Sequence, residues 1–528
     1  MSRAAFSVLF AGALALGLAF RLAGLDARPM HHDEANQAVK FGALLEEGEY
    51  RYDRTDHHGP TLYYLTLPAA WLRGRSTLAS LDERTIRLVP AAFGAGLILL
   101  FLLLQRRLGR TAVAAAALLA AVSPALTYYS RFYIQESMFA FFTFAFLVAL
   151  GRYAEHPAAG RAALAGLLAG LAYATKETSV IVVAAGLAAC FVARGWGAVV
   201  RAAEPAGVRG YRWTDLTLAL SAALAVSFLF YSSFFANPAG FVESILAFSV
   251  YFQRGVEASG HAQPWDYYLR MLSWSAAGGL VWTEAFILAL GAAGTVWAFM
   301  TREPGTFWPR FIALYSWIAA VIFSALRYKT PWNLLPFHAG FVLMAGIGIA
   351  AVGKAGGRRL SGGTTVPGRQ LRAAIAGVVL LAGAAHLGLQ SWRGNFRYAA
   401  DPRNPYVYAH TSPDFLRLVD RVENLSAVHP NREAMLVKVF AGPYEQWPLP
   451  WYLRGMSRVG YWRLAAEAGT LEAPVVIASQ ENTAAVEAAL GDRYVSEFYG
   501  LRPGVLLTAY IDRTLWERFL ASRRSPHE

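Results

Sequence analysis

Cysteine and charge are both scarce in this sequence. The 528 residues include a single cysteine, Cys190, so no disulfide can form within the chain. Charged residues make up 16% of the chain and hydrophobic residues 56%, whereas soluble domains have about 25% charged and about 45–50% apolar residues. The composition therefore excludes a single soluble domain, a disordered chain and a disulfide-stabilised scaffold.

Long apolar runs dominate the first three quarters of the chain. A helix needs about 20 apolar residues to cross a bilayer, and eleven segments approach that length. They lie near residues 4–24, 86–104, 111–128, 137–153, 161–176, 178–194, 214–235, 275–299, 311–326, 334–352 and 373–391. Residues 61–72, TLYYLTLPAAWL, are too few to span and suit a helix that lies at the membrane interface. We therefore expect residues 1–391 to form a mainly α, polytopic transmembrane domain.

Basic residues gather in alternate loops between these runs. The loops are 105–110, 154–160, 195–213, 300–310 and 353–372, and their only acidic residues are Glu155, Glu204 and Glu303. The positive-inside rule places such loops in the cytoplasm. We expect an inner (cell) membrane protein with a cytoplasmic N-terminus, anchored by an uncleaved first helix because no small-x-small cleavage site follows it. The net charge of +13 is explained by these loops, so nucleic acid is not an expected partner.

The last quarter of the chain has a different pattern. Charged residues return, and apolar runs shorten to strand length at 434–440, 473–479 and 504–511. Helix-like stretches at 412–425 and 482–494 alternate with them. This alternation predicts a small α/β domain over residues 392–528. After eleven spans this domain is expected to lie outside the cytoplasm.

The first predicted outer loop, residues 25–60, is rich in titratable side chains. It contains the run His31, His32, Asp33 and Glu34. Residues 33–47 predict a helix, and a carboxylate near its N-terminus is favoured by the helix dipole and can act as a cap. A solvated loop with a capped amphipathic helix would explain this pattern, but two carboxylates at the mouth of a membrane protein also indicate a functional site.

The same loop carries residue types that bind divalent metals. His31, Asp33, Glu34, His57 and His58 have side chains acceptable to zinc or manganese, and His32 adjoins them. Adjacent residues on a helix point about 100° apart, so the HHDE run cannot supply four ligands to one ion. A divalent metal held by His31, His32 or His57 therefore remains an open hypothesis, and no other cofactor is predicted.

Lysine is the rarer cation, with 5 Lys against 43 Arg. Three of the five lysines, Lys40, Lys176 and Lys329, fall at the predicted outer side, and so do Arg131, Glu136 and His261. Snorkelling of long side chains at the interface would explain such positions. We favour a cationic pocket for a phosphate, beside a carboxylate that removes a proton.

Several segments together resemble the GT-C membrane glycosyltransferases. The Asp-Glu loop, HGPTLYYLTLPAAWL, RTIRLVPAAFGAGLILLFLLLQRRLG, YYSRFYIQESMFAFFTFAFLVAL and LAGLAYATKETSVIVV are similar to the branch of protein O-mannosyltransferases and lipid A aminoarabinose transferase. Within that branch, HHDEANQAVKFG, HHGPTLYYLTLP, PWNLLPFH and YVYAHTSPDFLRLVDRVE look most like the bacterial and archaeal "flippase activity-associated" family. The resemblance covers nearly the whole chain.

This resemblance implies a site and a reaction. The first acidic residue of the loop in the relatives corresponds to Asp33, the implied base, with Glu34 beside it, and their later Arg and acidic residue correspond to Arg131 and Glu136. Where aminoarabinose transferases carry a lysine, this chain has His58, and a neutral or half-protonated histidine would hold a phosphate less firmly.

The implied activity is inverting transfer of a sugar from a polyprenyl-phosphate donor to an unidentified protein, lipid or glycan at the extracytoplasmic face. Lys176, Lys329, Arg131 or His58 would neutralise the leaving phosphate.

Two other classes of function are open. One is a transporter for lipid-linked sugars, or an accessory protein for their flipping. Transporters usually carry inverted repeats and midplane charges in broken helices, and this sequence shows neither feature. The other is a non-catalytic assembly protein whose external domain binds a partner.

The loop AGPYEQWPLPWYLRG (441–455) also has two interpretations. Its aromatic residues Trp447, Trp451 and Tyr452 could stack on sugar or polyprenyl, which requires the loop to fold over residues 25–60. They could instead anchor the domain at the membrane interface.

Overall fold

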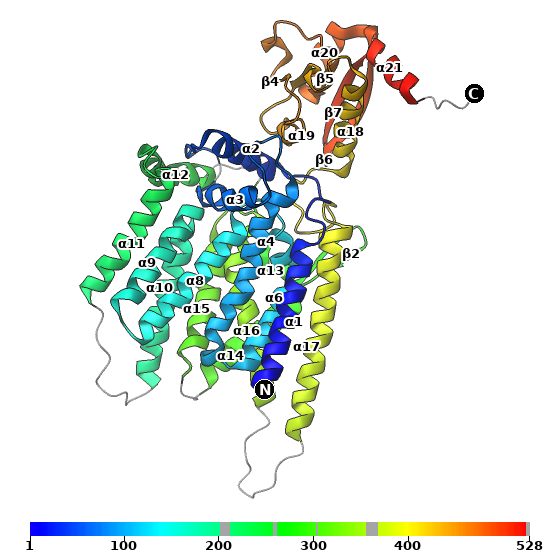
Figure 1. Cartoon of the computed structure of the whole chain (residues 1–528). Coiled ribbons are helices and arrows are strands. Elements are labelled where there is room, and N and C mark those ends of the chain that lie inside the picture. The colour runs from blue at the N-terminus through cyan, green and yellow to red at the C-terminus, as the bar shows by residue number, and fades with distance from the viewer. Residues whose placement is uncertain (57, 201–211, 257–260, 302–304, 355–367, 524–528) are drawn as a thin grey trace, which may run out of the picture.

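The computed structural model consists of a helical bundle with a small sheet domain at one end (Figure 1). The structure describes residues 1–56, 58–200, 212–256, 261–301, 305–354 and 368–523. The N-terminus lies at the end of the bundle opposite the C-terminal domain. We call the end of the bundle next to that domain the domain-side face.

Eight helical segments of the described chain are long and apolar enough to cross a membrane. They are α1 (Arg3–Leu22), the continuous α4 (Glu83–Leu100), η1 (Phe101–Leu104) and α5 (Gln105–Leu108), α8 (Glu136–Glu155), α10 (Ser179–Val200), α11 (Trp213–Tyr231), α15 (Phe307–Ala325), η2 (Pro331–Leu334) with α16 (Leu335–Lys354), and α17 (Gly368–Trp392) with the π-helical turn η3 (Arg393–Arg397). The expected multi-pass transmembrane helical domain is confirmed.

Three shorter helices occupy the remaining predicted positions. They are α6 (Arg110–Val122), α9 (Ala159–Thr175) and α14 (Ala285–Met300). Helices α6 and α14 pack against α16, and α9 packs against α8 and α11. All three run within the bundle (Figure 1), so the eleven predicted segments correspond to eleven bundle helices of unequal length.

Two predicted spans differ from the observed helices. The span predicted at 275–299 begins only at Ala285, because β1 (Ser275–Ala277) and β2 (Leu280–Trp282) form a hairpin that turns through two glycines with positive φ. The span predicted at 111–128 is divided into α6 and α7 (Pro124–Tyr129). Proline at the first position of α7 has no amide hydrogen to continue the ladder, and Ser123 caps the new helix.

Helices α2 (His32–Glu47), α3 (Thr61–Leu72) and α12 (Ala239–Val256) lie at the domain-side face (Figure 1). Helix α3 is the short helix expected at residues 61–72. Helix α2 begins with a capping box in which His31 Nδ1 accepts the Asp33 amide and Glu34 accepts the His31 amide, and it ends at Gly48 with φ of 76°. The short helix α13 (Tyr267–Ser273) precedes the β1–β2 hairpin.

The expected small C-terminal α/β domain is confirmed. Its five-stranded sheet has the order β4-β3-β5-β7-β6, with β4, β3 and β5 parallel and β5, β7 and β6 antiparallel. The elements are α18 (Pro413–Val428), η4 (Arg432–Ala434), β3 (Val437–Phe440), α19 (Leu449–Tyr452), β4 (Val459–Trp462), η5 (Ala465–Glu467), β5 (Val475–Ser479), η6 (Gln480–Asn482), α20 (Thr483–Leu490), η7 (Gly491–Arg493), β6 (Tyr494–Arg502), β7 (Val505–Asp512) and α21 (Arg513–Arg523).

The sheet strands that the sequence did not predict are the two edge strands. The inner strands β3 and β5 are buried throughout, between apolar clusters on both faces of the sheet, and therefore form continuous apolar runs. Strands β4 and β6 are only partly buried. The predicted helix 482–494 ends at Leu490, and β6 begins at Tyr494.

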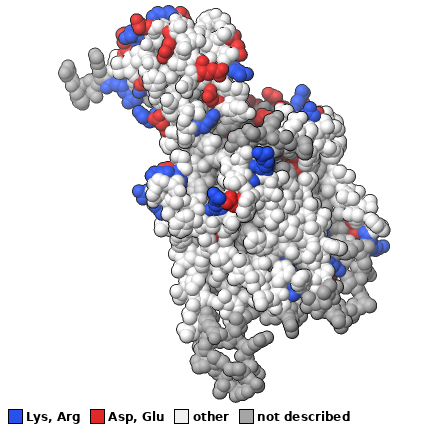
Figure 2. Space-filling model, turned by 180° about the vertical axis from the view of Figure 1, so that it is seen from behind, with Lys and Arg blue, Asp and Glu red and all other residues white. Residues whose placement is uncertain are grey.

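Charge is distributed as a membrane-embedded bundle requires. Figure 2 shows that most of the bundle surface on that side is uncharged and that charged side chains gather on the C-terminal domain and near its junction with the bundle. Large apolar side chains such as Val321, Met300 and Leu381 are more than 60% exposed on the bundle. Exposure of these apolar side chains to water would be unfavourable, whereas lipid chains provide an equally apolar environment.

Candidate functional site

One face of α2 carries three polar residues at spacings of three and four. Asp33, Gln37 and Lys40 lie on the same side of the helix because of this spacing. Gln37 Oε1 accepts a hydrogen bond from Gln135 Nε2 at 2.5 Å, and Lys40 Nζ lies 2.6 Å from Asp56 Oδ2. We call this row and the groups it adjoins the polar seam: Asp33, Gln37, Lys40, Asp56, His58, Gln135, Glu136, Lys176, Glu177 and Asn333.

Asp33 is the accessible carboxylate of the Asp-Glu pair. Its side chain is 31% exposed, and Oδ2 lies 3.8 Å from His31 Nδ1. The other nitrogen of the same ring, His31 Nε2, lies 3.0 Å from the backbone oxygen of Tyr408, and the pKa of Tyr408 is raised by burial and by the negative charge of Asp33. Asp33 is therefore positioned at the domain-side face where an incoming group can reach it.

Glu34, in contrast, is fully buried and bound on every side. Arg87 contacts both carboxylate oxygens at 2.8 Å, and the backbone amides of His31 and Tyr133 donate to them at 3.0 and 2.8 Å. Burial by itself would raise the pKa of Glu34, but the charges of Arg87 and Arg28 and these hydrogen bonds outweigh it and lower the pKa. These contacts give Glu34 a structural position that joins α2 to α4 and to the segment before α8, and its expected catalytic role stays a prediction.

Lys176 and Glu136 form a buried ion pair in the middle of the seam. Lys176 Nζ lies 2.6 Å from Glu136 Oε1 and 2.9 Å from Asn333 Oδ1. Glu136 is the first residue of α8, where a negative charge is favoured by the helix dipole. The pair therefore holds together the ends of α8, α9 and η2. The expected role of these two residues in binding the donor phosphate stays a prediction.

His58 reaches the seam from the loop before α3. Its Nδ1 lies 3.1 Å from Glu177 Oε2. Glu177 is fully buried and was not among the predicted site residues. The signal that could have identified it was present, because an acidic residue directly follows Lys176 between two apolar helices.

Lys329 and His261 lie in two segments that pair beside the seam. The Lys329 amide donates to His261 O at 3.0 Å, and Lys329 Nζ donates to the backbone oxygens of Gln263 and Leu326. His261 Nδ1 lies 2.5 Å from the hydroxyl of Tyr408. His261 thus contacts the residue whose backbone oxygen binds His31 at the start of α2, whereas the ammonium group of Lys329 holds backbone segments together.

Arg131 does not belong to the predicted phosphate pocket. Its guanidinium donates to the carbonyl oxygens of Phe20, Ala23 and Gly24 at 2.9, 2.6 and 2.8 Å. These carbonyls end α1 and have no partners within the helix, so a buried cation satisfies them and the negative end of the helix dipole. The expectation that Arg131, Lys176 and Lys329 share one pocket is therefore corrected.

Two of the three histidines proposed as metal ligands, His31 and His32, have other contacts. His31 Nδ1 accepts the Asp33 amide, and its Nε2 donates to Tyr408 O at 3.0 Å, so this ring has no nitrogen left for a metal ion. The ring of His32 packs on Tyr444 and Trp447 with centroid distances of 5.9 and 6.2 Å. His57 lies outside the described residues. Within the part of the chain that the structure describes, no three His, Cys, Asp or Glu side chains form a metal site.

The aromatic loop 441–455 folds over α2 and the segment before it. The Met30 amide donates to the hydroxyl of Tyr452 at 2.9 Å, and Trp451 Nε1 donates to Glu83 Oε1 at 2.8 Å. Trp451 is completely buried, whereas Tyr444 is 75% exposed. The loop thus lies where a ligand role requires it. Because Trp451 is completely buried, its ring can neither stack on a sugar or polyprenyl group nor anchor the domain at the membrane interface.

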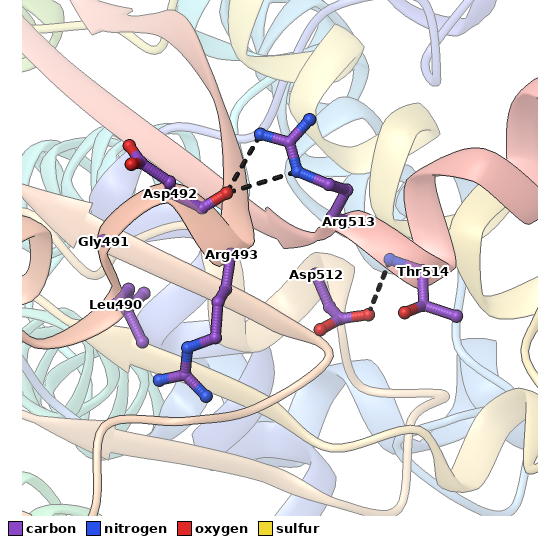
Figure 3. A pocket seen from close by; sticks show the side chains of 7 residues that line it. All are labelled: Leu490, Gly491, Asp492, Arg493, Asp512, Arg513 and Thr514. Atoms are coloured by element: carbon purple, nitrogen blue, oxygen red, sulfur yellow. Dashed lines mark hydrogen bonds between the residues drawn. The ribbon is translucent and has the colours of Figure 1, made fainter.

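A separate surface hollow of about 490 Å³ lies in the C-terminal domain (Figure 3). Its lining residues are Leu490, Gly491, Asp492, Arg493, Asp512, Arg513 and Thr514. Arg513 donates to the backbone oxygen of Asp492, Arg493 pairs with Glu472, and Asp512 accepts the amide of Thr514 at the start of α21. The charged groups of this hollow form hydrogen bonds and ion pairs with neighbouring parts of the domain, and none of the polar-seam residues lines it.

Comparisons with known proteins agree with this architecture. Residues 66–205 match the family model of dolichyl-phosphate-mannose-protein mannosyltransferases. The fold is similar to that of ArnT from Cupriavidus metallidurans bound to undecaprenyl phosphate, with a TM-score of 0.62 and 15% identity over 96% of this chain and 98% of that chain.

A second similar structure is the oligosaccharyltransferase AglB from Archaeoglobus fulgidus in complex with an inhibitory peptide and a dolichol-phosphate. Its TM-score is 0.57, with 12% identity over 97% of this chain and 74% of that chain. No curated protein sequence matches the chain. The expected GT-C-like fold is confirmed, and the closer likeness to the flippase-associated family stays a prediction.

Proposed function

We propose that this chain is a membrane glycosyltransferase that moves a sugar from a polyprenyl-phosphate donor to an acceptor at the extracytoplasmic face. The observation that carries the proposal is the accessible carboxylate of Asp33, placed at the start of α2 within the polar seam of a GT-C-like fold. The matched family of residues 66–205 supports the sugar-transfer chemistry. The bound undecaprenyl phosphate of the similar ArnT structure supports a lipid-linked donor.

We also infer that the domain-side face is extracytoplasmic and that the chain lies in the inner (cell) membrane. Helix α4 starts at the domain-side face, where Glu83 contacts Trp451, and the continuous α4–α5 segment ends near Arg106 and Arg107. Arg110 donates to the backbone oxygen of Met1, so these arginines lie beside the N-terminus at the opposite end. By the positive-inside rule that end faces the cytoplasm.

In the proposed reaction Asp33 accepts the proton of an acceptor hydroxyl. The acceptor oxygen forms a bond to the anomeric carbon of the sugar as the bond from that carbon to the phosphate oxygen breaks. The phosphate leaves with the bonding electron pair on the polyprenyl phosphate, and attack from the opposite side inverts the anomeric configuration. A positioned base contributes about 10²- to 10⁴-fold to such a step.

The leaving phosphate requires stabilisation of its charge. The ammonium group of Lys176 is shared between Glu136 and Asn333, and that of Lys329 holds backbone oxygens. The side chain of His58 is 26% exposed, and one ring nitrogen contacts Glu177. We therefore assign His58 to the donor phosphate, with Lys176 as a nearby positive charge.

The test is transfer of labelled sugar from a polyprenyl phosphate by the purified protein, with a membrane extract as the source of acceptor. We expect transfer by the wild type and a loss of about 10²-fold or more in Asp33→Asn, which keeps the size of the side chain but cannot accept the proton. Glu47→Gln at the exposed end of the same helix is the matched control and should retain activity.

Two outcomes would contradict the proposal. Wild-type activity in a well-folded Asp33→Asn protein would remove Asp33 as the base. Binding of the lipid donor without transfer to any acceptor would instead favour the accessory or flipping function.

A further inference from the structure

We propose that Glu177 is a positioning residue that fixes the ring of His58 so that its Nε2 atom faces the donor phosphate. This inference rests on the function proposed above, and it adds a buried residue that does not itself contact the donor. The evidence comes from the partners of Glu177, from the orientation of the His58 ring and from the backbone around Gly59.

Glu177 accepts hydrogen bonds at both carboxylate oxygens. Oε1 accepts from the hydroxyls of Tyr52 and Tyr231 at 2.7 and 2.9 Å, and Oε2 accepts from Tyr251 at 2.7 Å and from His58 Nδ1 at 3.1 Å. An ionised carboxylate has about four acceptor sites, so each one is occupied. Burial alone would raise the pKa of Glu177, but the hydrogen bond and charge of His58 and the hydrogen bond of Tyr251 lower it.

The partners of Glu177 come from separate parts of the chain. Tyr52 lies in the loop after α2, Tyr231 is the last residue of α11, and Tyr251 lies in α12. Three tyrosines alone would supply a buried carboxylate with three donors, and the fourth position is occupied by His58. Only His58 and Tyr251 among these partners are partly exposed, and His58 is the one that can carry a positive charge. The cost of burying the Glu177 charge is therefore offset in part at a partner that reaches the surface.

The contacts of His58 define which ring nitrogen is available. Nδ1 lies within 3.1 Å of Glu177 Oε2 and 3.0 Å of the Tyr251 hydroxyl. Because an ionised carboxylate only accepts hydrogen bonds, Nδ1 carries the hydrogen. The side chain is 26% exposed while Glu177 is fully buried, so Nε2 lies at the edge away from Glu177, and no described residue forms a hydrogen bond with it.

The backbone next to His58 is fixed independently. A Cβ atom on Gly59 would lie 2.1 Å from the carbonyl oxygen of Ala174 and 2.9 Å from the hydroxyl of Tyr231. Only glycine permits this close approach of the loop to the end of α9. Thr61 Oγ1 also donates to Thr175 Oγ1 at 2.8 Å. The end of α9 and Glu177, two residues later, thus hold both the backbone and the ring of His58.

The arrangement assigns separate roles to the two residues. With both ring nitrogens protonated, His58 donates a hydrogen bond from Nε2 to a phosphate oxygen while Nδ1 donates to Glu177. The Glu177 carboxylate favours this charged form and holds the ring in the orientation that the phosphate contact needs. Removing Glu177 should therefore weaken the phosphate contact without removing the group that makes it. This distinguishes a positioning residue from one that only stabilises the fold.

The experiment measures binding of undecaprenyl phosphate to the purified full-length chain in nanodiscs, together with sugar transfer. We expect Glu177→Gln to raise the Kd about tenfold, the size of one charged hydrogen bond, and to lower kcat/KM by at least as much. Tyr52→Phe is the matched control, because it removes one donor to Glu177 but leaves the Oε2 to His58 contact, and its Kd should stay within about twofold.

The decisive comparison uses the His58→Ala background. If Glu177 acts through His58, Glu177→Gln adds no further loss of affinity there, because residues that act as a unit are not additive. An equal loss in both backgrounds, or wild-type affinity in Glu177→Gln, overturns the proposal. If Glu177→Gln does not fold, Tyr251→Phe replaces it, with an expected loss of about threefold, and unchanged affinity in this variant overturns the proposal.

The same measurements separate this inference from the proposed function. Undecaprenyl phosphate that binds in a Glu177-dependent way, without sugar transfer by the wild type, overturns the function and leaves the positioning role. Transfer that depends on Asp33 but not on Glu177 overturns the positioning role alone. No binding of undecaprenyl phosphate by the wild type overturns both.

Discussion

At the scale of single residues, the adjacent carboxylates Asp33 and Glu34 have opposite environments. Neighbouring residues on a helix point about 100° apart, so one faces the seam and the other faces the bundle. Glu34 meets Arg87 in a two-point contact, whereas Asp33 keeps 31% of its side chain exposed. The same chemical group is therefore a structural anion at one position and a candidate base at the next.

The ion pair of Glu34 should contribute to stability in a pH-dependent way. Glu34→Gln leaves the buried guanidinium of Arg87 without its counter-charge, so we expect a loss of about 3 kcal/mol near neutral pH. The pKa of Glu34 is lowered from 4.5 to about 2. The stabilisation is thus present above pH 4.5 and is lost as the pH falls toward 2. The measurement is the thermal unfolding midpoint of both proteins between pH 7 and pH 2.5.

The matched control is Glu47→Gln, an exposed residue of the same helix. Its unfolding midpoint should follow that of the wild type at every pH. A constant difference between Glu34→Gln and the wild type from pH 7 to pH 2.5 would contradict the assigned ionisation of Glu34.

At the scale of helices, the polar groups of the bundle gather at helix ends. Arg131 donates hydrogen bonds to backbone carbonyls at the end of α1, Glu136 is the first residue of α8, and Lys176 and Glu177 lie between α9 and α10. Backbone groups at helix ends lack partners within the helix, and in a membrane protein these ends are where polar side chains are least costly. The seam therefore combines the row on α2 with a junction of helix ends at Glu136, Lys176 and Glu177.

Gly59 makes the contact between such an end and the loop that carries His58. In Gly59→Ala the added methyl group would clash with the carbonyl of Ala174, so the loop must move away from α9 and take His58 with it. We expect a stability loss of about 1–3 kcal/mol and weaker binding of undecaprenyl phosphate. The measurements are thermal unfolding and lipid binding in nanodiscs.

Gly160, near the start of the same helix, is the matched control. A Cβ atom there would have no neighbour within 4 Å, so Gly160→Ala should leave both stability and binding nearly unchanged. Equal effects of the two substitutions would show that the close approach at Gly59 has no special role.

At the scale of the whole molecule, the C-terminal domain is attached to the domain-side face through several contacts. Thr411 donates to Met30 O at 2.7 Å, Tyr406 donates to Glu284 at 2.7 Å, and the short helix α19 packs against α2. The first and third of these contacts involve α2 or the segment directly before Asp33, and the second reaches the start of α14. The domain and the candidate site are therefore parts of one packed structure.

Trp451 is the largest buried side chain of this attachment. In Trp451→Ala the contact with Glu83 and the stacking of Arg454, 3.9 Å above the ring, are both lost. We expect a stability loss of about 3–5 kcal/mol and faster cleavage within residues 398–411 in limited proteolysis. Slower transfer should accompany both changes because the segment before Asp33 loosens.

Tyr444→Ala is the control in the same loop, since Tyr444 is 75% exposed. Its stability and protease resistance should match the wild type. If Trp451→Ala behaves in the same way, the domain is not held to α2 through this residue.

The sequence by itself determined the classes of element and their order. Transmembrane helices require about 20 apolar residues regardless of their neighbours, and buried strands such as β3 and β5 form short apolar runs, so both kinds of signal are local. The start of α2 was also predictable, because capping involves residues within one helical turn. Asp33 was singled out from the sequence because the Asp-Glu loop resembles the corresponding loop of the GT-C membrane glycosyltransferases.

Only the tertiary structure decided which polar residues meet. Arg131 was expected at a phosphate and instead ends α1, and Glu34, which was expected in catalysis, binds Arg87, 53 residues away. Glu177 gained its role from Tyr52, Tyr231, Tyr251 and His58, which lie 54 to 125 residues from it. Charge and hydrogen bonding act through space over a few ångströms, so the partner of a buried polar group is set by helix packing and not by its neighbours in the chain.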